Sequence, residues 1–143
     1  MDTANEIQFR IVKCEELSFE TKLSASMKVD LNTVSFRFGF RIVPSGEDKV
    51  SFIISALYFL GKDQILKQES SSTFEISNFD SALDFSVNGK VDDKVGIVPT
   101  LFSISYSTMR GMLAIRTAGT VLESFPAPIV NPTEITHKSI INK

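Results

Sequence analysis

Apolar and polar residues alternate along the first part of the chain, a pattern typical of β-strands that bury one face. The alternation over residues 6–19 predicts a first strand. A second strand, beginning near Met27 or Val29, has one strongly apolar face. That face consists of Val34, Phe36, Phe38, Phe40 and Ile42.

Two further strands follow short turns. Residues 44–49 have turn chemistry, and residues 50–60 are rich in β-formers up to Gly61-Lys62-Asp63. Residues 64–77 alternate again. Because strands joined by short turns pair antiparallel, we expect a four-stranded antiparallel meander, with a long crossover at residues 20–30 between the first two strands.

The second half of the chain predicts helices. Residues 99–118, ended by Gly119, form the one strong helix, and a short helix over 80–87 is followed by a loop. Prolines keep the segment after residue 125 extended until a short helix over residues 132–141. The expected fold is therefore α+β, a single domain over residues 1–143, which matches the usual size of one domain.

The long helix has almost no polar face. A wide apolar arc includes Met112 and Ile115, and only Arg110 and Arg116 carry charge. Small residues follow each other along a separate stripe, made of Ser103, Ser107, Gly111, Ala114 and Ala118. Small stripes let helix backbones approach closely, so we interpret this one as an oligomer interface. The alternative is that the stripe packs on the protein's own sheet or faces water.

Composition excludes several classes of protein. Hydrophobic residues make up 43% of the chain against 22% charged, which favours a folded protein over a disordered one. A net charge of −2 gives no basic field for nucleic acid. One cysteine, Cys14, no secretory pattern at the N-terminus and no apolar run of ~18 residues predict a cytoplasmic protein that is not inserted in a membrane.

Catalytic chemistry is not indicated by any motif. The single His137 lies in the predicted tail, and the glycines form no phosphate-binding loop or nucleophile elbow. Glu15-Glu16 and Asp92-Asp93 are interpreted as solvated charges, since neighbours on a strand point to opposite faces. Cys14 has only Lys13 nearby to activate it. We expect no enzyme activity, no cofactor and no metal.

Several local matches resemble the SecB family of protein-export chaperones, in which four antiparallel strands precede a long helix. The most specific is Glu16-Leu17-Ser18-Phe19-Glu20, which is similar to the family's Ser-Phe-Glu run. It is joined by Gly61-Lys62-Asp63, by Phe74-Glu75-Ile76, by Leu101-Phe102 with Tyr106 and Arg110, and by Gly119-Thr120 followed by Ala127-Pro128.

The chain also departs from that family. The Phe-Pro-Tyr of the helix is Phe102-Ser103-Ile104-Ser105-Tyr106, and a basic tail replaces the usual acidic one. Lys67 stands where the family tends to have an acid for docking the export motor. The resemblance implies a homotetramer, a dimer of dimers, that holds unfolded or newly made polypeptides without ATP. Its partner would be the export motor SecA or, for a chaperone dedicated to one client, an antitoxin.

Two sets of residues are predicted to make these contacts. The crossover and the segment after the helix carry large apolar groups where a loop would be polar, so Leu23, Met27, Val121, Leu122 and Phe125 are expected to bind clients, unless they pack in the core. Glu16 and Glu20, expected on one face of the first strand, would dock the motor, unless they are ordinary solvated acids. The alternative function is a hot-dog-type acyl-thioester enzyme, in which the helix follows the first strand.

Overall fold

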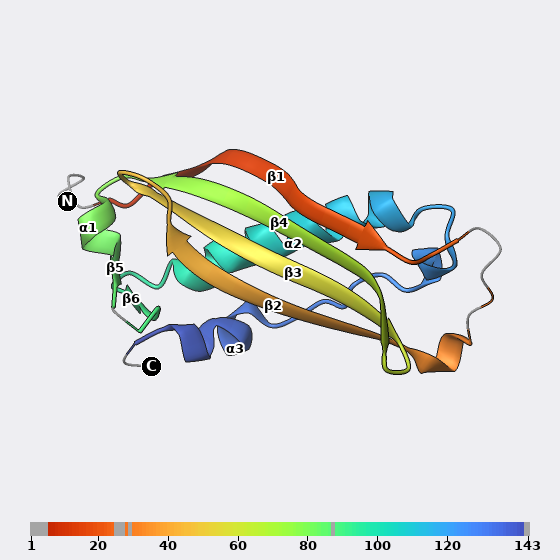
Figure 1. The fold of residues 1–143 in the computed structure, drawn as a ribbon. Coiled ribbons are helices and arrows are strands. Elements are labelled where there is room, and N and C mark those ends of the chain that lie inside the picture. The colour runs from red at the N-terminus through yellow and green to blue at the C-terminus, as the bar shows by residue number, and fades with distance from the viewer. Residues whose placement is uncertain (1–5, 25–27, 29, 87, 142–143) are drawn as a thin grey trace.

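A sheet of four antiparallel strands lies against one long helix in the computed structural model, which describes residues 6–24, 28, 30–86 and 88–141 (Figure 1). The elements are β1 (Phe9–Thr21), β2 (Val34–Pro44), β3 (Lys49–Leu60), β4 (Asp63–Ile76), α1 (Phe79–Ala82), β5 (Leu83–Phe85), β6 (Val91–Asp93), α2 (Val98–Thr117) and α3 (Pro132–Thr136). Single 3-10 turns cover Leu31–Thr33, Val121–Ser124 and His137–Ser139. The α+β fold with a long helix and a short C-terminal helix is as predicted.

The strand order differs from that of a simple meander. β2, β3 and β4 follow each other as predicted, but β1 pairs with β4, so the order is β1-β4-β3-β2. β1 and β2 therefore lie at opposite edges of the sheet. β2 begins at Val34, later than predicted; Met27 and residue 29 lie outside the described residues.

The core lies between α2 and the inner face of the sheet. Even-numbered residues of β3, from Val50 to Tyr58, are buried against the helix. The buried face of α2 consists of Val98, Leu101, Phe102, Ser105, Tyr106, Met109, Leu113 and Thr117. This face is narrower than the predicted arc, because Met112 is only half-buried and Ile115 is 79% exposed. The helix therefore turns a nearly uncharged side away from the sheet.

Asp93 was interpreted as a solvated charge, and that interpretation is wrong. Its side chain is buried, and its carboxylate accepts hydrogen bonds from the backbone N–H groups of Ile97 (2.8 Å) and Val98 (2.9 Å). These groups begin α2 and have no partner within the helix, so a carboxylate there stabilises the helix start. Asp93 ends β6, a strand in the region predicted as a loop.

A hairpin replaces most of the short helix predicted over 80–87. Only α1 is helical there, and β5 pairs with β6 around a turn at Gly89. Gly89 has a φ of 77°, which glycine adopts without strain, and the N–H of Ser86 donates to the carbonyl of Lys90 at 2.9 Å to close the turn. Within the described residues, no helix is long and apolar enough to cross a bilayer.

Two bulges interrupt β1, and they overturn the expectation that Glu16 and Glu20 share a face. The register with β4 shifts between Ile11 and Lys13 and again between Glu16 and Ser18. A shift of one residue moves all later side chains to the other face. Glu16 is therefore opposite Ser70, on the inner face, whereas Glu20 is opposite Lys67, on the outer face.

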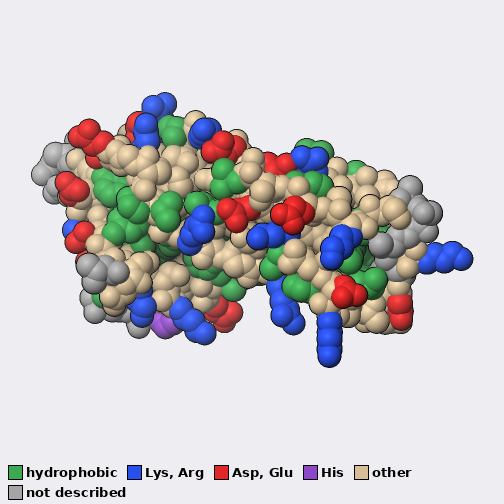
Figure 2. Space-filling model, in the orientation of Figure 1, with side chains coloured by type: hydrophobic (Ala, Val, Ile, Leu, Met, Phe, Trp, Pro, Cys, Tyr) green, Lys and Arg blue, Asp and Glu red, His purple; other side chains and the backbone are tan. Residues whose placement is uncertain are grey.

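The outer face of the sheet is not covered by a helix (Figure 1). Figure 2 shows this face, with Lys, Arg, Asp and Glu side chains lying over the strands and apolar groups between them. On β3 the outer positions include Ile53, Leu57 and Phe59, all half-buried. The sheet therefore has one face largely buried against α2 and one open face that carries both charged and apolar side chains.

Candidate functional site

The segment after α2 runs back beside the helix and is fastened by three side chains. The hydroxyl of Tyr58 donates to the carbonyl of Phe125, and the hydroxyl of Tyr106 donates to the carbonyl of Pro128 at 2.6 Å. Arg110 Nε donates to the carbonyl of Ala127 at 2.9 Å. All three bonds are made to backbone oxygens, so they fix the path of an extended chain rather than its side chains.

The two tyrosines are held in their neutral form. Burial raises the pKa of Tyr58 to about 12, with a smaller contribution from Tyr106. Burial also raises the pKa of Tyr106, against the opposing charge of Arg110. Both hydroxyls therefore stay protonated as donors throughout the physiological range.

Aromatic side chains of β2 line the same flank of α2. Phe38 packs edge-on against Tyr106 with ring centres 5.1 Å apart, and Phe40 lies 4.8 Å from Phe102. Phe36 contacts Tyr58 at 5.1 Å. Such pairs add specific contacts to plain apolar burial. Phe36, Phe38 and Phe40 nevertheless remain half-buried, because β2 is the last strand of the sheet.

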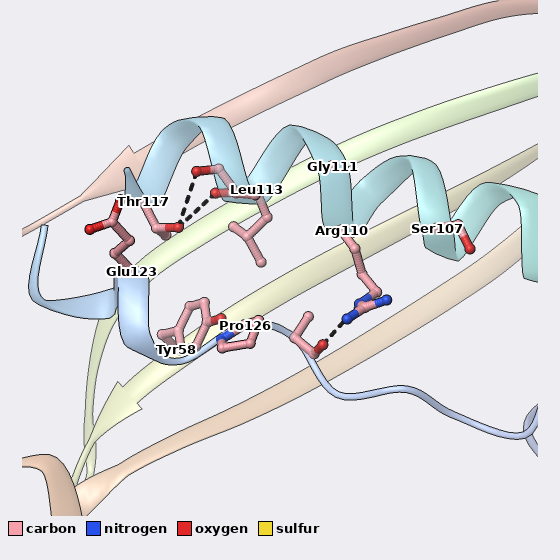
Figure 3. A pocket seen from close by; sticks show the side chains of 10 residues that line it. Tyr58, Ser107, Arg110, Gly111, Leu113, Thr117, Glu123 and Pro126 are labelled. Carbon is pink, nitrogen blue, oxygen red and sulfur yellow. Dashed lines mark hydrogen bonds between the residues drawn. The ribbon is translucent and has the colours of Figure 1, made fainter. Parts of the chain in front are cut away.

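A pocket of about 440 Å³ opens between α2 and the fastened segment (Figure 3). Tyr58 and Leu113 lie toward its floor, and Gly111 lies on the helix above it. The remaining lining residues are Ser107, Arg110, Ala114, Thr117, Glu123, Pro126 and Ala127. The wall is mostly apolar with a few polar groups, so it suits a side chain of a bound peptide or of another copy.

The small stripe of α2 faces away from the sheet. Ser107, Gly111, Ala114 and Ala118 are exposed, and Ser103 is half-buried. A Cβ added to Gly111 would meet no heavy atom within 4 Å. The alternative that the stripe packs on the protein's own sheet is therefore wrong. The stripe faces either water or another molecule.

The predicted client-binding residues have different environments. Leu23, Val121 and Phe125 are half-buried, and they lie at the same end of the molecule, where β1 and α2 end (Figure 1). Leu122 is 0% exposed and packs in the core, the alternative that the sequence left open. Met27 lies outside the described residues.

Glu16 is engaged with the end of α2. Its carboxylate accepts hydrogen bonds from Arg116 Nε at 3.0 Å and from Gln68 Nε2 at 2.8 Å. The bond from Arg116 lowers the pKa of Glu16, and the guanidinium lies over the ring of Phe19 at 4.4 Å. Glu20 is exposed. The two acids predicted to dock a motor thus have separate surroundings, because the bulge between Glu16 and Ser18 changes the face on which later side chains lie.

The described residues that could serve catalysis lie apart from one another. His137 is exposed in its 3-10 turn, and Cys14 is exposed on β1, where its Sγ lies 3.8 Å from Ser72 Oγ. Among the described residues, no three His, Cys, Asp or Glu side chains are grouped to hold a metal ion. α2 follows all four strands, which is not the hot-dog order with its helix after the first strand.

Comparison with solved structures finds a chaperone of similar fold. The SecB-like chaperone Rv1957 of Mycobacterium tuberculosis, in complex with a ChAD peptide from the antitoxin HigA1, superimposes with a TM-score of 0.54. The match covers 85% of this chain and 89% of that chain at 14% sequence identity. No family model and no curated protein matches the sequence. The chain therefore has a SecB-like fold.

Proposed function

We propose that this protein is a SecB-like chaperone that holds unfolded polypeptides without ATP. The observation that carries the proposal is the uncharged outer side of α2. Arg110 and Arg116 are the only charged residues of that helix, and each is bound to another element of the same chain. An apolar helix side with open pockets beside it suits a protein that binds exposed apolar segments of other chains.

The client groove is proposed at the end of the molecule where β1 and α2 end. Leu23, Val121 and Phe125 are half-buried there, so each keeps an accessible apolar part. Leu122 supports this segment from within the core. Half-buried apolar side chains above a buried core can bind clients of varied sequence, because apolar contacts are non-directional.

We propose the small stripe as the contact between copies in a tetramer. Gly111 has open space around it, and its neighbours Ser107 and Ala114 are small and exposed. A neighbouring helix can approach such a surface closely. The same surface borders the pocket beneath the fastened segment, so assembly would also change the shape of that pocket.

The client is proposed to be one dedicated protein, such as an antitoxin, rather than the general export pool. The similar structure holds a peptide from an antitoxin, which supports this choice by analogy of fold. Lys67, with the separation of Glu16 from Glu20, speaks against an acidic docking patch for SecA. The alternative within the same function is a general export chaperone that passes its clients to SecA.

Aggregation of a chemically unfolded enzyme, followed by light scattering without ATP, tests this function. We expect wild-type protein to suppress scattering at near-stoichiometric ratios. Phe125→Ser should weaken suppression, whereas Val95→Ser should not, because Val95 is 49% exposed but lies before α2, away from the proposed groove. Unchanged scattering with wild-type protein, across several unfolded clients, would refute a holdase.

A further inference from the structure

β2 is an edge strand with a regular edge. Its register with β3 runs without a shift from Val34 to Pro44, whereas the other edge strand, β1, is bulged twice. Within the described part of the chain, the backbone of β2 forms hydrogen bonds only with β3. A long, regular edge of this kind is a template for another strand, and bulges are one way in which proteins prevent such pairing.

The outer side of this edge is basic. Arg37 and Arg41 are exposed, two positions on either side of Gly39. Arg41 is 3.7 Å from Glu69, and Arg37 lies over the ring of Phe59 at 5.1 Å without an ion-pair partner among the described residues. On β2, β3 and β4 together, Arg37, Arg41, Lys49 and Lys67 share the outer face with two carboxylates, Glu69 and Glu75. The whole chain, by contrast, has a net charge of −2.

Gly39 leaves a gap between the two arginines that the fold does not require. The φ of Gly39 is not positive, so other residues could adopt its backbone conformation, and an added Cβ would meet no heavy atom within 4 Å. A glycine inside a strand weakens it, and it often marks a place where another chain approaches closely. A large side chain on a neighbouring strand could lie over Gly39, as aromatic residues do beside edge glycines.

The inner side of the same edge is apolar and incompletely covered. Phe36, Phe38 and Phe40 alternate with Arg37, Gly39 and Arg41, and all three rings remain half-buried after packing on α2 and Tyr58. A strand added to β2 would place its own alternate residues against these rings. A segment paired with β2 would therefore place acidic side chains on the outer side and apolar side chains on the inner side.

We infer that β2 binds an extended segment of a client by strand addition, and that this segment alternates acidic with apolar residues. Its acids would face Arg37 and Arg41, a large residue would lie over Gly39, and the apolar residues would cover Phe36, Phe38 and Phe40. Backbone bonds supply affinity in this mode, and alternate side chains supply selectivity. The inference deepens the proposed function, on which it rests, by naming the class of client segment.

A second copy of the chain fits the edge less well than an acidic segment. Antiparallel pairing of two β2 strands about Gly39 would place Arg37 of one copy opposite Arg41 of the other. Like charges directly opposite each other destabilise a strand pair. Charge complementarity therefore favours an acidic occupant.

Binding of a fluorescent twelve-residue peptide that alternates Glu with Val and Phe tests the inference, with anisotropy as the readout. We expect Arg37→Glu/Arg41→Glu to weaken binding about tenfold or more, because each cross-strand charge pair changes from attractive to repulsive. Arg10→Glu/Lys13→Glu is the matched control, since it reverses two cations of the same face at the β1 edge. Added salt should weaken binding to the wild-type protein.

Two peptides methylated on alternate backbone nitrogens distinguish strand addition from attraction to a flat basic face. A paired strand uses one of its edges, so one methylated peptide should lose binding and the other should keep it. Equal binding of both peptides, or an equal loss in the two charge variants, would overturn the inference. So would a changed assembly state of Arg37→Glu/Arg41→Glu in sedimentation, which would place a second copy on this edge. If the wild-type protein does not bind the peptide but still suppresses aggregation, only this inference is overturned. If it does neither, the proposed function is rejected as well.

Discussion

The two flanks of α2 are closed in different ways. The flank beside β2 is covered by the protein's own segment 121–131, fastened through Tyr58, Tyr106 and Arg110. The flank beside β1 is joined to the helix by Arg116, which donates a hydrogen bond to Glu16 and places its guanidinium over the ring of Phe19. On that side Phe9 is 38% and Ile11 44% exposed, although both are on the inner face of the sheet.

This difference shows what a small domain can cover with its own chain. The inner face near β1 carries small or polar residues, such as Cys14, Ser70 and Ser72, so α2 gains little there from apolar burial. The aromatic residues of β2 instead pack on Phe102 and Tyr106 of the helix, on the opposite side. The open flank therefore leaves the apolar side chains of Phe9 and Ile11 accessible to another molecule.

Disrupting the core beneath the closed flank should have the largest effect on stability. Leu122→Ser removes a fully buried side chain and places a hydroxyl in the core, so the free energy of unfolding should fall by about 3 to 5 kcal/mol. Phe125→Ser, at a half-buried position, should cost clearly less stability and more client affinity. Denaturant unfolding and client binding, measured for both variants, check this. Equal losses of stability would place Phe125 in the core.

The face between the two flanks is tested by Gly111→Leu. In an isolated monomer this change should raise helix stability by up to about 1 kcal/mol, because glycine is a poor helix former and an added Cβ at this position meets no heavy atom within 4 Å. In a close helix contact the same side chain would overpack and split the assembly, at a typical cost of about 1 to 3 kcal/mol. Sedimentation and thermal unfolding together separate the cases. A tetramer of raised stability would mean that the small stripe faces water.

Loosening one fastener of the closed flank should have a moderate effect. Tyr58→Phe leaves the carbonyl of Phe125 without its donor, which should cost about 1 to 3 kcal/mol. Because burial raises the pKa of Tyr58 from 10.0 to about 12, its contribution is complete below pH 10 and is lost as the pH rises to about 12. Wild type and variant should therefore converge over that range in unfolding experiments. A constant difference would assign the effect to packing alone.

The sequence predicted the closed flank better than the open one. Alternation located β3 and β4 and the apolar face of β2, although not the start of β2, and prolines indicated an extended segment after α2, because these signals are local. The pairing of β1 with β4, its bulges and the cap at Asp93 depend on contacts between distant residues, and residue pattern alone does not encode them. The 79% exposure of Ile115, in the predicted apolar arc, and the full burial of Leu122, predicted either to bind clients or to pack in the core, have the same reason, since burial is decided by what packs against a residue.

The smallest effect is expected at the single ion pair of the open flank, and it is best seen through pH. Arg116 lowers the pKa of Glu16 below its ordinary value of 4.5, so Glu16 stabilises the folded state above that pH. As the pH falls through the lowered pKa, the carboxylate is protonated and this stability is lost. Glu16→Gln should therefore be slightly less stable than wild type at neutral pH and nearly equal to it in acid, since partly exposed pairs contribute little. Glu20→Gln is the matched control, because Glu20 is exposed on the opposite face. Urea unfolding of the three proteins from neutral to acidic pH gives the comparison, and parallel curves for Glu16→Gln and wild type would show that Arg116 does not hold β1 to α2 in solution.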